Sequence, residues 1–301
     1  MIPIGSRNAG AFLRKIVHMI HEIFPHKFSN EFKVCAPRPD DYVIRYDGSK
    51  TLLKKQGDSY AIPRVCELLG AEGKDIEGFK GHYLLNIDGA AFFLDDCPNK
   101  TAPEGYEFVG NRTFRTMSPV ERLGGVTSVH IAHWECLNRF CGRCGCETTR
   151  SEKERAIVCP KCDNVVYPRI SPVVIVAVRN GERLLMAHNI DNPNPRLFLI
   201  SGFVEVGESL EQAVHREVLE EAGLRVKNVR YFGSQPWPFS DSLIAGYTAE
   251  LDGDDTIRMQ EAELSEAMWV KREDIPEYET DVSISCCLIE NFRRGFQLSE
   301  S

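Results

Sequence analysis

A predicted helix at 209–223 constrains the structure of this chain most, because some of its charges lie on its apolar side. Ser209, with a glutamine three residues later, forms a capping box, and Gly223 is a natural helix stop. At about 100° per residue, Glu217 and Glu221 lie about 40° apart, on the side of the apolar stripe. That stripe consists of Leu210, Ala213, Val214 and Val218. Bare carboxylates facing a core repel one another and are costly to bury, so the pattern indicates a function rather than a solvated charged face.

Bound divalent metal would offset the cost of these carboxylates, because Mg²⁺ and Mn²⁺ prefer oxygen ligands. Such an ion polarises a diphosphate and lowers the pKa of an attacking water, while a carboxylate positions or deprotonates that water. Arg216 can orient and partly neutralise the cluster, and Glu205 and Glu208 on the preceding loop can add ligands or a base. The pattern leaves the identity of the base open. The catalytic candidates are Arg216, Glu217, Glu220 and Glu221.

Two C-x-x-C pairs, separated by fourteen residues, predict a second metal site. Their thiolates suit tetrahedral Zn²⁺, and the four ligands are Cys141, Cys144, Cys159 and Cys162. Four cysteines leave no position for water, and no basic cluster accompanies them. We therefore expect a structural clip rather than a catalytic or nucleic-acid-binding zinc, with Cys146 as a bystander.

The overall composition excludes some broad classes of protein. The net charge of −8 argues against loose, charge-driven binding to nucleic acid or anionic membrane. No apolar run is long enough to span a bilayer. Eleven cysteines without an export signal indicate a reduced, cytoplasmic protein. An apolar stripe between Phe12 and Phe24 predicts a packing or dimer-contact helix, with a membrane-surface helix as the minor alternative.

The order of predicted strands, helices and motifs along the sequence predicts five segments and an α+β fold. Asn180-Gly181 between two apolar runs predicts a hairpin, and strands followed by helices predict a mixed sheet covered by helices. The expected parts are an N-terminal helix (1–30), a β-rich N-terminal domain (31–117), a linker helix (118–140), the zinc ribbon (141–167) and a C-terminal catalytic domain (168–298).

The segment 202–224, GFVEVGESLEQAVHREVLEEAGL, resembles the Nudix box, G-x5-E-x7-R-E-U-x-E-E-x-G-U with U apolar. It matches every defined position: Gly202, Glu208, Arg216, Glu217, Val218, Glu220, Glu221, Gly223 and Leu224. The resemblance implies a Nudix α/β/α sandwich with a mixed sheet, and hydrolysis of a nucleoside diphosphate linked to another moiety. It also implies Mg²⁺ or Mn²⁺ bound by Glu217 and Glu221, with Glu220 assisting.

The segment 234–242, SQPWPFSDS, is similar to the SQPWPF-x-x-S signature of the NADH pyrophosphatase branch, as are the zinc ribbon and Tyr167-Pro168. Serine stands at 240, where the family usually has proline. The two prolines that flank Trp237 suit aromatic stacking on a base or nicotinamide, and packing of these aromatics against the sheet is the alternative. The resemblance implies substrate contacts by Gln235, Pro236, Trp237, Pro238, Phe239, Ser240, Asp241, Ser242, Tyr167, Glu154, Phe203, Ser285 and Arg115. It adds the Ser201 carbonyl and Glu263 as metal ligands.

The family reaction implied is hydrolysis of NADH or NAD⁺ to NMN(H) and AMP, with removal of an NAD cap from RNA 5′ ends. The resemblance also implies a homodimer, with Tyr167 supplied across it. A Nudix enzyme for another substrate, such as ADP-ribose, is one alternative. A zinc-ribbon nucleic-acid-binding protein with an inactive Nudix domain is the other, and the intact glutamates argue against it.

Overall fold

The computed structural model describes residues 19–96, 101–190, 195–260, 262–277 and 283–295 of the chain. It divides into two compact units. Unit 1 comprises Met1–Met19, Val173–Gln235 and Ile244–Ser301, and unit 2 comprises Ile20–Pro172 and Pro236–Leu243. None of the helices in these described stretches is long and apolar enough to cross a membrane.

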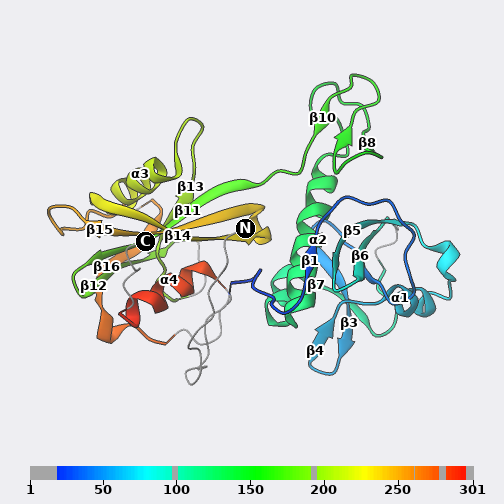
Figure 1. The fold of residues 1–301 in the computed structure, drawn as a ribbon, viewed down its shortest axis with the longest axis horizontal. Helices are drawn as coiled ribbons and strands as arrows, with labels where there is room; N and C mark the ends of the chain where they lie inside the picture. Colours follow the sequence, from blue (N-terminus) through cyan, green and yellow to red (C-terminus); the bar gives the residue numbers. More distant parts are fainter. Residues whose placement is uncertain (1–18, 97–100, 191–194, 261, 278–282, 296–301) are drawn as a thin grey trace. The chain divides into compact units, whose positions relative to one another are not determined.

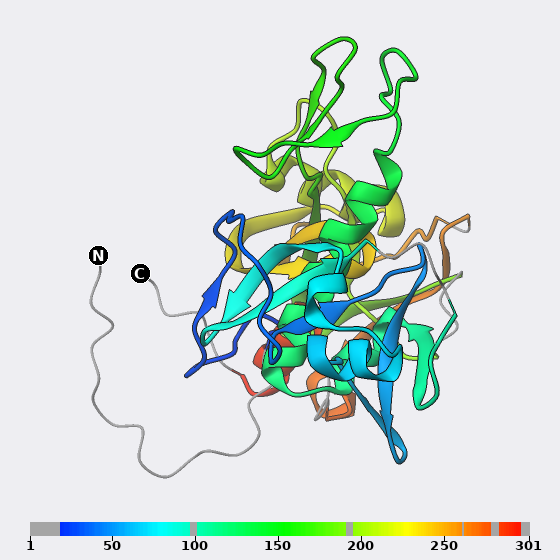
Figure 2. The ribbon, with the colours of Figure 1, turned by 90° about the vertical axis from the view of Figure 1, so that its right-hand side faces the viewer.

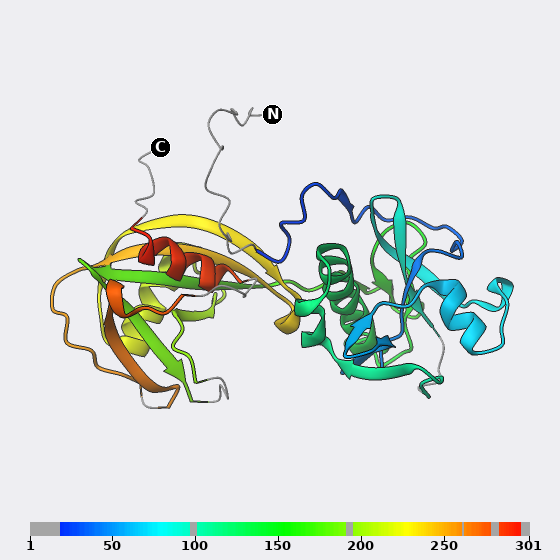
Figure 3. The same cartoon turned by 90° about the horizontal axis from the view of Figure 1, so that it is seen from below.

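Unit 1 is built on one six-stranded sheet with helices on both faces (Figures 1 and 3). The strand order is β14-β15-β11-β12-β16, and β13 pairs with β11. The strands are β11 (Ser171–Asn180), β12 (Arg183–Asn189), β13 (Ile200–Phe203), β14 (Val226–Trp237), β15 (Ser242–Leu251) and β16 (Leu264–Lys271). The helices are α3 (Leu210–Ala222) and α4 (Ile284–Arg293), with a short 3-10 turn η4 (Arg272–Asp274).

The alternation of side chains along β11 fixes which helix covers which face of this sheet. Val174 and Val176 pack with α3 residues, whereas Ile175 and Ala177 pack with α4 residues. This arrangement confirms the α+β class and the expected sandwich. The predicted hairpin is also present, with β11 and β12 antiparallel and its turn at Gly181, whose φ is +57°.

Unit 2 contains two small sheets and a long helix. The first sheet has the order β1-β5-β6-β2, and the second has the order β4-β3-β7. The elements are β1 (Phe28–Ser29), β2 (Tyr42–Ile44), β3 (Lys50–Gln56), β4 (Ser59–Ala61), α1 (Val65–Ala71), η1 (Ile76–Gly78), β5 (Gly81–Ile87), β6 (Ala90–Asp95), β7 (Tyr106–Gly110), η2 (Asn111–Thr116), α2 (Pro119–Leu137) and η3 (Pro238–Ser240).

Helix α2 is the long helix of unit 2, and its residues contribute to the core of this unit. Ser118 caps its N-terminus by accepting a hydrogen bond from the Glu121 amide, and Pro119 follows in the first turn. Gly124 and Gly125 let the rings of Phe92 and Phe114 approach the helix backbone, since a Cβ at either glycine would lie within 2.4 Å of a ring atom. Gly124 therefore allows α2 to pack against the first sheet, and Gly125 allows it to pack against η2.

A zinc ribbon of three short strands follows α2, with the order β10-β9-β8 (Figure 2). The strands are β8 (Thr149–Arg150), β9 (Ile157–Val158) and β10 (Val165–Val166). Arg150 joins the ribbon to the rest of unit 2, because its guanidinium lies 2.7 Å from Asp96 and 2.8 Å from Glu135. Glu135 in turn lies 2.9 Å from His82 on β5.

The N-terminal helix expected over 1–30 falls largely outside the described residues. In the described part, 19–30, the prediction is wrong: the chain turns near Ile20 and then forms the short strand β1. Ile20 and Ile23 are nevertheless buried in the core of unit 2. Their burial agrees with the apolar stripe, but they lie in a turn and an irregular segment, and the only paired strand of this stretch, β1, begins after Pro25.

Candidate active site

Helix α3 forms for the reasons that its sequence indicates. The Ser209 hydroxyl accepts a hydrogen bond from the Gln212 amide at 3.2 Å, and the Gln212 side chain accepts one from the Ser209 amide at 2.8 Å. Gly223 ends the helix in the left-handed region, with φ of +67°. The predicted capping box and stop are both confirmed, and they fix the rotation at which the glutamates leave the helix.

Glu217 and Glu221 are buried, at 8% and 6% exposure, as their helical positions predict. Burial, together with the neighbouring charges of Glu217 and Glu263, raises the pKa of Glu221 to about 8. Burial also raises the pKa of Glu217, against the opposing effect of Arg216. This is a cluster of oxygen donors with too little positive charge of its own, which fits a divalent cation.

Gly202 on β13 makes room for the Glu217 carboxylate. A Cβ at position 202 would lie 2.1 Å from both Cδ and Oε1 of Glu217. The first glycine of the box therefore serves close approach, and its own φ is not in the left-handed region.

Arg216 organises the loop and the helix around this cluster. Its guanidinium donates hydrogen bonds to Glu208 at 2.7 and 2.9 Å, to Glu217 at 2.6 Å, to Glu220 at 3.0 Å and to the Phe203 carbonyl at 2.9 Å. The bonds from Arg216 lower the pKa of Glu208 to about 2, aided by the Glu205 amide. The sequence left Glu208 open as a metal ligand or as the base. In the structure its carboxylate accepts hydrogen bonds from Arg216.

The remaining metal-ligand candidates lie in unit 1 as well. Ser201 is on β13, directly before Gly202, and β13 packs against α3. Glu263 is exposed on the turn before β16, and its charge acts on both Glu217 and Glu221. Ser201 and Glu263 thus belong to the elements around the buried carboxylates, while Glu220 stays exposed at the flank of α3.

Three substrate-contact candidates of unit 1 have different surroundings. Phe203 is 54% exposed at the end of β13, so its ring is free to contact a ligand. Gln235 is fully buried, and its Oε1 accepts a hydrogen bond from the Ile284 amide at the start of α4 at 2.6 Å. Ser285 lies in the first turn of α4, and its hydroxyl is buried without a hydrogen-bond partner. Gln235 is therefore engaged in holding α4.

The other substrate-contact candidates belong to unit 2. Tyr167 is 56% exposed, and its hydroxyl donates a hydrogen bond to Glu154 at 3.2 Å. Two residues that were inferred separately are thus brought together at the ribbon. The Arg115 guanidinium lies 5.4 Å from the centre of the Trp237 ring, a cation–π contact.

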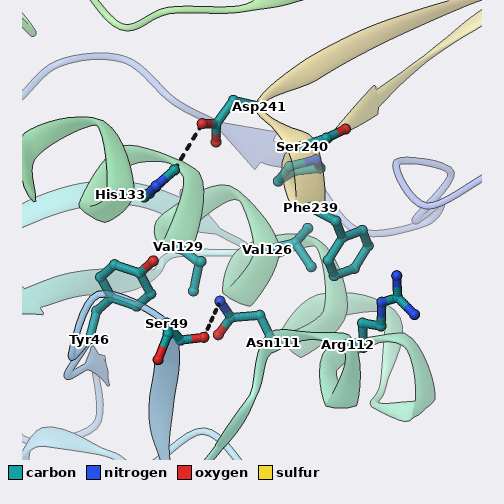
Figure 4. A pocket seen from close by; sticks show the side chains of 11 residues that line it. Tyr46, Ser49, Asn111, Arg112, Val126, Val129, His133, Phe239, Ser240 and Asp241 are labelled. Atoms are coloured by element: carbon teal, nitrogen blue, oxygen red, sulfur yellow. Dashed lines mark hydrogen bonds and ion pairs between the residues drawn. The ribbon is translucent and has the colours of Figure 1, made fainter. Parts of the chain in front are cut away.

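The segment 236–243, here called the aromatic loop, joins β14 to β15. Trp237 and Phe239 meet edge to face at 5.0 Å, and Phe239 also packs against the core of unit 2. Within the loop, Asp241 has a left-handed backbone conformation. Its buried carboxylate accepts a hydrogen bond from His133 at 2.8 Å (Figure 4). The Ser242 hydroxyl bonds to the Ser240 carbonyl, and Pro236 and Pro238 flank Trp237. Phe239 thus packs against the core of unit 2, whereas the alternative left open by the sequence was packing against the sheet of the catalytic domain.

The four predicted zinc ligands converge in the ribbon. Their sulfur atoms all lie within 4.8 Å of one another, with Cys141 and Cys162 at 3.7 Å and Cys144 and Cys159 at 3.5 Å. Tetrahedral zinc with bonds of about 2.3 Å requires sulfur separations of about 3.8 Å, so the four thiols fit zinc. The Arg143 amide lowers the pKa of Cys141, which favours the thiolate. Cys146 lies outside this cluster of described residues.

Sequence reasoning missed two functional contacts. One is the pairing of Glu208 with Arg216, which the eight-residue spacing does not reveal. The other is the contact of His133 with Asp241, which joins residues 108 positions apart. No local pattern points to either partner, so only the folded chain could identify them.

Comparison with known families agrees with this geometry. Residues 169–287 match the model of the NUDIX domain, and residues 137–167 match the NADH pyrophosphatase zinc ribbon domain. The sandwich, the buried glutamates of α3 and the four-cysteine ribbon therefore define a Nudix hydrolase with an attached zinc ribbon.

Similar proteins of known name indicate the family within the Nudix hydrolases. A protein named NAD-capped RNA hydrolase NudC from Mannheimia succiniciproducens is 36% identical over 233 residues, or 73% of this chain and 84% of the relative. A protein of the same name from Pasteurella multocida is 43% identical over 248 residues, or 81% of this chain and 92% of the relative. One from Escherichia coli is 42% identical over 163 residues, 54% of this chain and 63% of the relative. The chain belongs to the NudC family of NAD-capped RNA hydrolases.

Proposed function

We propose that this protein hydrolyses the diphosphate of NADH and NAD⁺ to NMN(H) and AMP, and that it removes the NAD cap from RNA 5′ ends by cleaving the same bond. The observation that carries the proposal is the pair of buried carboxylates, Glu217 and Glu221, held against Gly202. Relatives named NAD-capped RNA hydrolase NudC support the choice of substrate.

Residues of α3, β13 and the turn before β16 would bind the metal together. Glu217, Glu221 and Glu220, with the Ser201 carbonyl and Glu263, would hold Mg²⁺ or Mn²⁺. A bound divalent ion would polarise the diphosphate and acidify a water molecule. Arg216 keeps Glu217 and Glu220 in fixed orientations, while Glu208 keeps Arg216 in place. These hydrogen bonds set the carboxylates in position before substrate arrives, which lowers the cost of orientation.

Substrate recognition would fall to exposed aromatic and polar side chains. Phe203 offers an exposed ring for stacking on nicotinamide or adenine. Tyr167 with Glu154 offers a hydroxyl and a carboxylate for ribose or amide groups. The aromatic loop, with Trp237 and Arg115, adds a further stacking surface. A homodimer, with Tyr167 acting across it, stays a prediction from the family resemblance, and a cytoplasmic location stays a prediction from the cysteines.

The test is to incubate the protein with NADH and Mg²⁺ or Mn²⁺ and to follow AMP and NMNH. With NADH we expect AMP and NMNH in equal amounts, and with NAD-capped RNA we expect NMN and RNA bearing a 5′-monophosphate in equal amounts. Glu221→Gln should lower kcat by about 100-fold or more, because it removes a charged metal ligand.

Glu211→Gln is the matched control, since it makes the same chemical change at an exposed position on the same helix. We expect it to retain activity within about three-fold of the unmodified chain. Full activity of Glu221→Gln would refute the metal assignment. Tight RNA binding without hydrolysis of NADH or capped RNA would instead favour the inactive, nucleic-acid-binding alternative.

A further inference from the structure

We propose that His133 is a positioning residue for the reaction: with His130, it anchors the aromatic loop through Asp241 and so pre-orders the surface that receives the dinucleotide. The inference rests on the proposed function, in which this loop contacts substrate. Helix α2 and the loop belong to the same compact unit, so the contact lies within unit 2.

The contact is specific in its geometry. Nδ1 of His133 lies 2.8 Å from Oδ2 of Asp241, and this ring nitrogen donates, because a carboxylate can only accept. Nε2 of His130 lies 3.6 Å from the other carboxylate oxygen and donates a hydrogen bond to the Arg169 carbonyl at 2.9 Å. Asp241 is only 8% exposed. A carboxylate this deeply buried needs partners, and α2 supplies them.

The loop depends on such an anchor because of its own sequence. The backbone of Asp241 is left-handed, with φ of +51° and ψ of +38°, a conformation that aspartate tolerates but does not favour. Ser240 stands where the family motif usually has proline, so φ at this position is not fixed covalently. The Asp241 carbonyl also accepts a hydrogen bond from the Ser171 amide at 2.8 Å, at the start of β11. Side chain and backbone of Asp241 thus fix the loop at two points.

A cavity of about 390 Å³ is lined by residues of both the loop and α2 (Figure 4). It is lined by Tyr46, Asn111, Arg112, Val129, His133 and Phe239, among others. Beside this cavity, Phe239 packs against the core of unit 2, so nondirectional packing holds part of the loop. The hydrogen bond from His133 to Asp241, at the edge of the cavity, adds a directional restraint to that packing.

The consequence for catalysis follows from preorganisation. A loop held in its binding conformation saves the cost of ordering it when substrate arrives, and that saving appears mainly in substrate affinity. Loss of the anchor should therefore raise KM and leave kcat nearly unchanged, since the metal-binding glutamates do not touch His133. General damage to the fold would lower kcat and thermal stability together.

The first experiment compares His133→Ala with His133→Asn in the full-length protein, using NADH and Mn²⁺. The amide nitrogen of asparagine occupies a position close to Nδ1, so it can donate the same hydrogen bond. We expect His133→Ala to raise KM about five-fold with kcat within about two-fold, and His133→Asn to restore most of the loss. Thr127→Ala, at another half-buried position of α2, is the matched control and should not change KM.

The Asp241→Asn variant completes a double-mutant cycle with His133→Ala. Asparagine keeps the left-handed backbone while removing the charge that His133 meets. We expect the KM of the double variant to be no more than about two-fold above the higher of the two single-variant values, because both changes weaken the same interaction. Independent, multiplicative effects would overturn the proposal, as would an unchanged KM in His133→Ala.

A readout without catalysis separates this proposal from the proposed function. In protein labelled with 5-fluorotryptophan, the signal of Trp237 can be assigned with Trp237→Phe. We expect that fluorine signal to shift or broaden in His133→Ala and to recover in His133→Asn. If the unmodified chain does not hydrolyse NADH, the proposed function fails. The fluorine signal of Trp237 still shows whether His133 holds the loop in place. An unchanged Trp237 signal in His133→Ala would overturn the anchor whatever the activity.

Discussion

At the scale of single residues, the site depends on how closely a glycine and a glutamate approach each other. Glu217 is buried against Gly202, and Arg216 holds it there with a hydrogen bond of 2.6 Å. The helical positions of Glu217 and Glu221 could be predicted from the spacing of the sequence alone. The role of Glu208 could not, because its pairing with Arg216 depends on the path of the loop between β13 and α3.

Gly202→Ala should disable the site without unfolding the protein. The new methyl group would lie about 2 Å from the Glu217 carboxylate, so that carboxylate must leave its position. We expect kcat for NADH to fall by about 100-fold and the concentration of Mn²⁺ needed for half-maximal rate to rise. Steady-state kinetics over a Mn²⁺ titration measure both.

Gly70→Ala is the control, because nothing lies within 4 Å of a Cβ at that glycine on α1. Its kinetics should match those of the unmodified chain. An active Gly202→Ala variant with an ordinary Mn²⁺ requirement would show that Glu217 need not stay where it lies.

At the scale of elements, local sequence signals and long-range contacts contribute differently. The start and end of α3 could be predicted from its capping box and its terminal glycine. The aromatic loop could be located by its motif, but its anchor could not, since His133 lies on a helix 108 positions earlier. The apolar stripe at the N-terminus predicted the burial of Ile20 and Ile23 but not their conformation, since Ile20 lies in a turn and Ile23 in an irregular segment.

Gly124→Ala should destabilise unit 2 although alanine is the better helix former. The favourable helix propensity of alanine amounts to about 1 kcal/mol. Its methyl group would lie 2.2 Å from the Phe92 ring, and such overpacking costs typically about 1–3 kcal/mol. We expect a lower thermal unfolding midpoint by circular dichroism, whereas Gly70→Ala should leave the midpoint unchanged or raise it. A rise in the midpoint for Gly124→Ala would contradict the close packing of α2.

The ion-pair network around His82 should make the stability of unit 2 depend on pH. Burial lowers the pKa of His82, but Asp96 and Glu135 outweigh that effect and raise it overall. A group with a raised pKa in the folded state stabilises fully below its unfolded value of about 6.5 and loses that contribution as pH rises through the folded value. Above pH 6.5 the stabilisation therefore decreases.

Thermal unfolding of the unmodified chain and His82→Gln across pH 5.5–9 measures this effect. We expect the difference in midpoint between the two proteins to be largest at the acidic end and to shrink as pH rises. A difference that is constant over this range would show that protonated His82 contributes nothing through Asp96 and Glu135.

At the scale of the whole molecule, we propose that one sequence motif carries the chemistry and that other segments set the substrate selectivity. The glutamates of α3 explain diphosphate hydrolysis in general. The ribbon and the aromatic loop distinguish this branch, and both belong to unit 2 rather than to the sheet that carries α3. The sequence could predict both segments from their motifs. It could not predict that 236–243 clusters with unit 2, since its flanking strands are part of the unit 1 sheet.

The most direct test of the central claim is a side-by-side comparison of kcat/KM for NADH, NAD⁺, ADP-ribose and NAD-capped RNA at one Mn²⁺ concentration. We predict that NADH is cleaved to NMNH and AMP at least about ten-fold more efficiently than ADP-ribose is cleaved. We also predict that capped RNA releases NMN and leaves a 5′-monophosphate. Intact NADH alongside rapid cleavage of ADP-ribose would contradict the account.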